Sequence, residues 1–105
     1  MKMIVAIIRP EKLPAVKQGL KAVGVEGITI TDVRGHGTQS GIKITTRVGS
    51  TVIDEIEKIK IETVVDDELE QPCIDAIIKA ANTGHFGDGR IFVMPVEKSI
   101  RVRQE

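Results

Sequence analysis

Glycine, acidic and basic residues crowd into the run Thr-Gly-His-Phe-Gly-Asp-Gly-Arg-Ile-Phe-Val at residues 83–93. The run follows a helical pattern and precedes an apolar one, so its glycines allow the backbone to turn sharply and bring bare amides close to a ligand. Such a loop suits an anion, above all phosphate. A tight turn in which glycine only supplies positive φ explains the same composition, and both interpretations stay open on the loop alone. We call residues 83–90 the glycine loop.

Two arginines near the end of the chain favour phosphate. Arg101 and Arg103 alternate with Ile100 and Val102. In a strand, this two-residue period places both guanidinium groups on one face and both aliphatic side chains on the other. Paired guanidinium groups hold phosphate oxygens bidentately. The glycine loop and the arginine tail, residues 100–103, therefore together predict a phosphate site.

The residue types give less support to other chemistries. An RNA-binding sheet needs exposed aromatic platforms, but the chain has only Phe86 and Phe92, and Phe92 lies in an apolar run typical of a core. Zinc or copper would need clustered ligands, whereas His36, His85 and Cys73 are far apart in sequence. We therefore expect neither RNA binding nor a site of these metals.

An enzyme would need an activated nucleophile or an acid–base pair in the glycine loop. Asp88 is present, but no histidine or serine stands at a suggestive spacing from it. We predict a binding protein without catalytic residues, in which Asp88 caps the turn. A small hydrolase of acylphosphatase or nucleotide-cleaving type, using the same loop and arginines on phosphate, is the alternative.

Length and charge limit the remaining possibilities. The 105 residues make one domain, residues 1–105, with 15 basic and 15 acidic side chains. This balance indicates neither nucleic acid nor an acidic membrane surface as a partner. The N-terminal apolar run is too short for a signal peptide or a membrane span, so we predict a cytoplasmic protein without membrane insertion. Cys73 has no cysteine partner and is predicted to be buried and inert.

Apolar periodicity predicts the elements that position the loop. Residues 3–8 form a continuous apolar run, typical of a central strand covered on both faces. A helical pattern follows from residue 11, with Pro14 in its first turn and Gly24 at its end. Residues 28–33 alternate as a half-buried strand. The pattern then dissolves between residues 34 and 54, where we predict a long mobile loop.

The second half of the chain repeats this order. Residues 58–65 alternate as a strand with one apolar side and one side that begins charged. Acids at residues 66–68 open a second helix that ends near residues 82–84, and its predicted buried stripe is Cys73, Ile74, Ile77, Ile78 and Ala81. Strands at residues 91–94 and 100–103 complete the pattern. The order predicts an α+β fold, a ferredoxin-like βαββαβ sandwich with an extra C-terminal edge strand.

Several motifs together resemble the PII family of nitrogen-regulatory signal-transduction proteins. Thr-x-x-x-Gly-Asp-Gly-Arg-Ile-Phe-Val at residues 83–93 closely resembles the B-loop of that family, and Arg-x-Arg at residues 101–103 is similar to its C-terminal phosphate contacts. The resemblance continues in Ile-Ile-Arg-Pro at residues 7–10, Gly-His-Gly-Thr-Gln at residues 35–39 and Lys-Ile-Lys-Ile-Glu at residues 58–62. It implies a homotrimeric signal transducer that binds ATP or ADP in each cleft between neighbours. The B-loop of one subunit and the C-terminal arginines of the next would hold the nucleotide.

The resemblance also implies roles for individual residues. Phosphate contacts would fall to Gly37, Gly87, Gly89, Arg90, Arg101 and Arg103, and the same nucleotide site would include Gly35, Thr38 and Asp88. Adenine and ribose contacts would fall near Ile7, Thr29, Glu62 and Val64. With ATP and Mg²⁺ the family binds 2-oxoglutarate, and the matching residues are Gln39, whose amide oxygen can complete a magnesium shell, and Lys58, which can meet a dicarboxylate. Without the resemblance, Gln39 is a solvated loop residue and Lys58 a strand-end charge.

The loop of residues 35–54 corresponds to the T-loop of the family and departs from its pattern. The usual Tyr-Arg-Gly-x-x-Tyr is Thr-Arg-Val-Gly-Ser-Thr at residues 46–51, so the tyrosine that many bacterial members have uridylylated is absent and this control is not expected. Arg47 is retained, and an arginine at this place plugs the pore in members that block ammonium channels. The predicted partner contacts are Lys43, Arg47, Ser50 and Thr51.

Three further departures bear on the nucleotide site and on the target. Thr38 replaces a usual basic residue, which removes one charge from the phosphate pocket and weakens ATP relative to ADP. Arg90 replaces a usual lysine and alters the donor geometry. The chain carries Gln104 where a longer tail usually begins. By resemblance the target is an ammonium transporter, a nitrogen-metabolism enzyme or nitrogenase, and the altered T-loop adds a carbon or bicarbonate transporter as an option.

Overall fold

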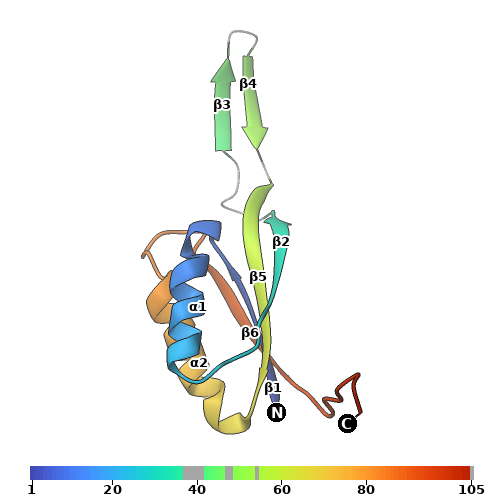
Figure 1. Ribbon diagram of the computed structural model, residues 1–105. Helices are drawn as coiled ribbons and strands as arrows, with labels where there is room; N and C mark the ends of the chain where they lie inside the picture. The colour runs from blue at the N-terminus through green and yellow to red at the C-terminus, as the bar shows by residue number, and fades with distance from the viewer. Residues whose placement is uncertain (37–41, 47–48, 54, 105) are drawn as a thin grey trace.

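Four antiparallel strands form the main sheet in the order β2-β5-β1-β6 (Figure 1). The computed structural model describes residues 1–36, 42–46, 49–53 and 55–104, and for residues 42–53 only the backbone. The strands are β1 (Lys2–Ile8), β2 (Thr29–Gly35), β5 (Ile56–Val65) and β6 (Gly89–Pro95). In register, Ala6 of β1 lies between Ile61 of β5 and Ile91 of β6. The predicted strands at residues 3–8, 28–33, 58–65 and 91–94 are therefore confirmed, with bounds that shift by a few residues.

Two helices cover one face of this sheet (Figure 1). A short 3₁₀ turn, Pro10–Lys12, leads into α1 (Leu13–Ala22), and another, Asp67–Leu69, leads into α2 (Glu70–Ala81). Pro14 lies in the first turn of α1, and Gly24, at φ +100°, follows its end, both as predicted. Neither helix is long and apolar enough to cross a membrane, and the rest of the described chain adds no other candidate.

The core lies between the helices and this face of the sheet. The alternation in β5 is confirmed, because Ile59, Ile61, Thr63 and Val65 are all buried. They pack with alternate residues of β1 and with the inner sides of α1 and α2, and the largest fully buried side chains are Ile4, Ile8, Val16, Leu20, Ile61, Cys73 and Ile77. Cys73 is fully buried and unpaired in a disulfide, as predicted, and burial raises the pKa of its thiol.

The opposite face of the sheet carries apolar side chains that no helix covers. Phe92 and Met94 of β6 lie opposite Val5 and Met3 of β1 on this face, and Val64 of β5 flanks Met3 on the other side. Phe92 is 48% exposed, so its predicted place in the core is wrong, and the helices cover only one face of the strand at residues 3–8, for which cover on both faces was predicted. The physical reason is that both helices pack on the same side. We call Met3, Val5, Val64, Phe92 and Met94 the open-face cluster.

The predicted buried stripe of α2 is too wide. Cys73, Ile77 and Ala81 are buried as expected, but Ile78 is 49% exposed and Ile74 is half-buried. Both isoleucines border a hollow that Ile91 and Arg90 of β6 also line. Helical spacing identifies an apolar side of the helix but not how much of that side the neighbouring strand reaches.

The segment predicted as a long irregular loop contains regular structure. β3 (Ile42–Thr46) and β4 (Gly49–Ile53) pair as an antiparallel hairpin that stands away from the sheet beyond the ends of β2 and β5 (Figure 1). The prediction of a pattern-free loop is wrong for these residues. Their β-branched composition favours strand even without a core to pack against. At the root of the hairpin, Arg34 Nη1 and Glu55 Oε1 form an exposed ion pair at 3.2 Å.

The extra strand predicted at residues 100–103 is not found. Residues 96–104 are described and contain no strand. The chain leaves β6 beside the N-terminus, where Val96 N donates to Met1 O at 3.1 Å, and then runs clear of the sheet (Figure 1). A strand needs a neighbour to satisfy its backbone groups, and none of the described strands pairs with the tail. Ile100 and Val102 are accordingly 73% and 102% exposed.

Candidate functional site

The glycine loop is folded around the carboxylate of Asp88. Asp88 Oδ2 accepts hydrogen bonds from Thr83 N at 2.7 Å and Gly84 N at 3.1 Å, and Oδ1 accepts one from the Thr83 hydroxyl. Asn82 Oδ1 accepts a second bond from Gly84 N at 2.8 Å. The hydrogen bond from the Thr83 hydroxyl, more than any other cause, holds the pKa of Asp88 well below its usual range. The prediction that Asp88 caps the turn is confirmed.

Glycine is required where the loop enters β6. Gly84, Gly87 and Gly89 all have positive φ, at +80°, +93° and +116°. A Cβ on Gly89 would lie 1.8 Å from the carbonyl oxygen of Ile7, so the backbones of β6 and β1 meet there more closely than any side chain allows. The loop is thereby fixed to the end of β1.

Arg9 holds the loop from the other side. Its Nε donates to Asp88 Oδ1 at 3.1 Å and its Nη2 donates to Phe86 O at 2.7 Å. The guanidinium of Arg9, the residue just after β1, thus contacts the loop at two points. Arg9 belongs to the Ile-Ile-Arg-Pro motif at residues 7–10, for which no contact with the glycine loop was predicted. A cation placed between a buried strand and a proline was the signal available.

Lys58 reaches the same loop from β5. Its Nζ donates to the carbonyl of Gly87, and a Cβ on Gly35 would lie 3.5 Å from its Cγ, so the end of β2 is also adjacent. Burial and then the nearby charge of Arg9 lower the pKa of Lys58, whereas Glu11 and Asp88 act in the opposite direction. Arg90 is the second residue of β6, lies opposite Ile7 of β1, and lines the hollow beside Ile74 and Ile78 of α2. Arg9 and Lys58 therefore contact a loop that contains one carboxylate and one arginine of its own, Arg90, and this surplus of positive charge suits an anion.

The predicted nucleotide residues that the structure describes, together with the predicted 2-oxoglutarate residue Lys58, separate into two groups. The first, which we call the loop-end group, lies around the glycine loop and consists of Ile7, Gly35, Lys58, Gly87, Asp88, Gly89 and Arg90. The second, the tail-end group, consists of Thr29, Glu62, Val64, Arg101 and Arg103. Lys58 and Glu62 are four residues apart on the same strand, which separates the two groups by roughly 13 Å along the sheet.

Three residues of the tail-end group line a small hollow. Thr29, Glu62 and Val64 line a volume of about 220 Å³, together with Met3, Gly27 and Thr63. Thr63 Oγ1 donates to Gly27 O at 2.7 Å and so fixes the segment that leads into β2. Glu62 Oε1 forms an ion pair with Lys60 Nζ at 3.6 Å.

The arginine tail starts from this end of the sheet. Ser99, two residues before Arg101, lines a hollow with Gly27 and Val64. The tail therefore starts from the end of the sheet that carries Thr29, Glu62 and Val64, whereas the glycine loop lies at the other end of β6 (Figure 1). Since β6 is 7 residues long, it carries the chain roughly 20 Å from its own glycine loop before the tail begins.

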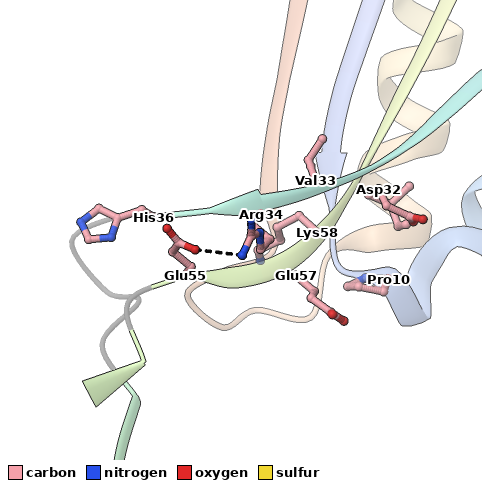
Figure 2. A pocket seen from close by; sticks show the side chains of 9 residues that line it. Pro10, Asp32, Val33, Arg34, His36, Glu55, Glu57 and Lys58 are labelled. Atoms are coloured by element: carbon pink, nitrogen blue, oxygen red, sulfur yellow. Dashed lines mark ion pairs between the residues drawn. The ribbon is translucent and has the colours of Figure 1, made fainter. Parts of the chain in front are cut away.

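A larger hollow of about 790 Å³ lies at the root of the β3–β4 hairpin. Figure 2 shows its lining side chains, most of them at the end of β2 and the start of β5, with His36 and Glu55 just beyond these strands and Pro10 from the turn after β1. Lys58 also lines it, which places the hollow next to the loop-end group. Its walls mix acids with bases, so the hollow has no uniform charge that would select one class of ligand.

Several predicted residues lie outside the described part of the chain. These are Gly37, Thr38, Gln39 and Arg47, and the side chains of Lys43, Ser50 and Thr51 are likewise outside it. Among the residues that are described, no group of three or more His, Cys, Asp or Glu side chains could hold a metal ion.

Comparison with known proteins matches the chain over nearly its whole length to one family. Residues 1–105 match the family described as Nitrogen regulatory protein P-II. Nitrogen regulatory protein P-II of Haemophilus influenzae is 48% identical over 103 residues, covering 98% of this chain and 92% of the relative. Nitrogen regulatory protein P-II 2 of Methanothermobacter thermautotrophicus is 50% identical, covering 98% and 90%. Nitrogen regulatory protein P-II 1 of Escherichia coli is 46% identical, covering 98% and 92%.

Proposed function

This chain belongs to the nitrogen regulatory protein P-II family of signal transducers, and we propose that it binds ATP or ADP in clefts between the subunits of a homotrimer. The bound nucleotide would set the state of the β3–β4 hairpin and its flanking segments, which a target protein reads. A ligand shifts such a segment only by as much as its affinity differs between the two states of the segment. The protein would act by binding, with no catalytic step.

The observation that carries this proposal is the separation of the two groups. The glycine loop and the arginine tail lie at opposite ends of the sheet, so one chain does not bring Gly87 and Arg103 onto the same phosphate (Figure 1). A head-to-tail arrangement of identical subunits would place the tail-end group of one copy against the loop-end group of the next. Such contacts close into a ring, and the resemblance to PII proteins gives the ring three members.

The residues of the loop-end group fit a phosphate. Gly87 and Gly89 supply backbone without side chains, and Lys58 and Arg90 supply positive charge. Asp88 would otherwise repel an anion, but its carboxylate is engaged by the loop itself and by Arg9. Arg101 and Arg103 of a neighbouring copy would add bidentate donors. In the tail-end group, the hollow beside Val64 would take the adenine or ribose.

The open-face cluster supports association. Phe92, Met94 and Val64 are 48%, 44% and 40% exposed. With Met3 and the nearly buried Val5 they form an apolar surface on the sheet face that faces away from both helices. Contiguous apolar surface of this kind commonly marks a protein–protein interface. Three sheets that turn these faces inward would bury the cluster in the centre of the trimer.

We propose Mg²⁺ and 2-oxoglutarate as further ligands of the ATP-bound state. Lys58 lies beside Gly87 and can meet a carboxylate of the dicarboxylate. Gln39, outside the described residues, would supply an oxygen to Mg²⁺, which when bound neutralises phosphate charge.

The regulated target would be contacted through residues of the T-loop region, Lys43, Arg47, Ser50 and Thr51. The candidates are an ammonium transporter, a nitrogen-metabolism enzyme, nitrogenase, and a carbon or bicarbonate transporter. We place the protein in the cytoplasm, where nucleotides and 2-oxoglutarate are available to it.

Isothermal titration of the purified protein with ATP and with ADP, each with and without Mg²⁺ and 2-oxoglutarate, tests this function. We expect roughly micromolar nucleotide binding that Arg103→Ala weakens strongly. Lys98→Ala, which removes an exposed cation of the same segment outside the predicted site, is the matched control and should leave the affinity unchanged. An absence of nucleotide binding at millimolar concentration would contradict the proposal. Steady release of phosphate from ATP or an acyl phosphate, abolished by Arg101→Ala, would favour the small hydrolase instead.

A further inference from the structure

Two cations compete for one carboxylate at the glycine loop. Arg9 and Lys58 lie so close together that a Cβ on Gly87 would be 3.3 Å from Arg9 Nη2 and 3.6 Å from Lys58 Nζ. Asp88 is the acid of this loop, and its charge influences Lys58. Which of the two cations pairs with Asp88 decides how much positive charge is left for a ligand.

The hydrogen bonds show that Arg9, and not Lys58, contacts the Asp88 carboxylate. Arg9 Nε donates to Asp88 Oδ1 at 3.1 Å, and Arg9 Nη2 is fixed in place by Phe86 O at 2.7 Å. Lys58 Nζ donates to the carbonyl of Gly87, which is a neutral acceptor. A hydrogen bond to a carbonyl orients an ammonium group without cancelling its charge, whereas a carboxylate contact cancels much of it.

Arg9 is better suited than Lys58 to hold this carboxylate. The planar guanidinium presents several donors in a fixed geometry, so it binds the carboxylate and the Phe86 carbonyl at the same time. A lysine presents one point charge on a flexible stem. Without Arg9, Asp88 Oδ1 would lose its charged partner, and the Lys58 ammonium beside Gly87 would be the nearest replacement among the cations described at this loop.

We propose that Arg9 is a positioning residue that keeps the Lys58 ammonium available to an anionic ligand by holding the Asp88 carboxylate in a separate ion pair. The inference rests on the proposed function, in which a carboxylate of 2-oxoglutarate meets Lys58. In this proposal the side chains of Arg9 and Asp88 pair with each other, and neither binds the ligand. It explains why an acid is compatible with a loop that binds anions.

Four proteins test the proposal by a double-mutant cycle: the wild type, Arg9→Gln, Asp88→Asn and the double variant. Isothermal titration with 2-oxoglutarate at saturating ATP and Mg²⁺ gives the affinity of each. We expect Arg9→Gln to bind 2-oxoglutarate about tenfold more weakly, since Lys58 turns to Asp88, and the double variant to recover most of that loss. Arg9→Lys should lose less than Arg9→Gln, and Lys12→Gln, which removes a nearby positive charge, should bind as the wild type does.

A second measurement needs no ligand. The Lys58 ammonium is titrated by nitrogen-15 NMR in all four proteins, with thermal unfolding as a check that each is folded. Asp88→Asn should change the pKa of Lys58 little when Arg9 is present and lower it clearly in the Arg9→Gln background. Equal effects of Asp88→Asn in the two backgrounds would overturn the inference. It would also be overturned if the double variant binds 2-oxoglutarate as weakly as Arg9→Gln, since Arg9 would then act on the ligand directly.

The two measurements separate failure of this inference from failure of the proposed function. A wild type that binds no 2-oxoglutarate, combined with a non-additive pKa cycle, would refute the dicarboxylate but support the ion-pair assignment. If the wild type binds 2-oxoglutarate but the effects of the two substitutions on the pKa of Lys58 are additive, the dicarboxylate would be supported and the ion-pair assignment refuted.

Discussion

Replacing Gly89 by alanine tests whether the glycine loop depends on the close approach of β6 to β1. Gly89 lies opposite Ile8 at the start of β6 and has φ +116°, a conformation that side chains rarely adopt. The added Cβ would lie 1.8 Å from Ile7 O, 2.8 Å from Ile7 C and 3.2 Å from Ile8 Cα. All three neighbours are backbone atoms, so no side-chain rotation relieves the contact.

The size of the effect follows from these distances. A carbon and an oxygen normally approach to about 3.3 Å, so the strands must separate by roughly 1.5 Å at this point. The strained φ costs about 1–3 kcal/mol for a residue with a side chain, and each ladder hydrogen bond lost adds about 1 kcal/mol. We expect Gly89→Ala to lower the free energy of unfolding by roughly 3–5 kcal/mol, a large part of the 5–15 kcal/mol typical of a domain.

Thermal and urea unfolding measure this loss, with all variants at the same protein concentration so that any association between chains affects them equally. The matched control is Gly84→Ala in the same loop, because Gly84 also has positive φ, at +80°, but a Cβ there meets nothing within 4 Å. The control should lose only about 1–2 kcal/mol, and Gly89→Ala should melt at least about 8 °C below it. Equal stability of the two variants would refute the account of the loop, since strain in φ alone would then explain both.

Three other changes test the packing and the charge of the fold. Ile77→Ala should lower the free energy of unfolding in urea by about 2–5 kcal/mol because Ile77 is 2% exposed. Ile78→Ala, at a position that is 49% exposed, should lower it by less than about 1 kcal/mol. Equal losses in the two variants would contradict the assigned buried face of α2. Thr63→Val should cost about 1–3 kcal/mol because the backbone carbonyl that accepts from its hydroxyl is left unsatisfied, while Thr63→Ser, which keeps the hydroxyl, should cost clearly less. The Thr83 hydrogen bond lowers the pKa of Asp88 in the folded chain below its ordinary value of 3.8, so the stability from the ionised carboxylate is fully present above that value and is lost as the pH falls below it. Urea unfolding from about pH 5 to about pH 3 should therefore show a steeper loss in the wild type than in Asp88→Asn, and parallel curves would contradict this role.

Local periodicity predicted most of the fold. The strands at residues 3–8 and 58–65 and both helices follow from the spacing of apolar residues, which depends only on neighbours in sequence. The spacing did not reveal which side of each element meets a partner. Ile78 and Phe92 are exposed because the helices cover one face of the sheet and α2 does not extend over all of β6. That depends on tertiary arrangement.

The candidate site was predicted in part, and the missing part depends on long-range contacts. Glycine spacing predicted a sharp loop, and the structure gives Gly84, Gly87 and Gly89 positive φ. The contact of Arg9 with Asp88 joins residues that are 79 positions apart, so no local pattern predicts it. The strand expected at residues 100–103 failed for the same kind of reason, because a strand forms only where another strand is available to pair with it.

Subunit mixing tests the central claim, a nucleotide site shared between neighbouring copies, most directly. Arg90→Ala removes a cation of the loop-end group, and Arg103→Ala removes one of the tail-end group. The two variants are mixed in equal amounts, unfolded and refolded together, and the number of ATP sites is measured by isothermal titration. Each variant alone should bind poorly. The mixture should regain about one quarter of the wild-type sites, because a cleft is intact when an Arg103→Ala subunit supplies the loop and an Arg90→Ala subunit supplies the tail. If the mixture binds no more ATP than the separate variants do, both groups act within one chain and the shared site is wrong.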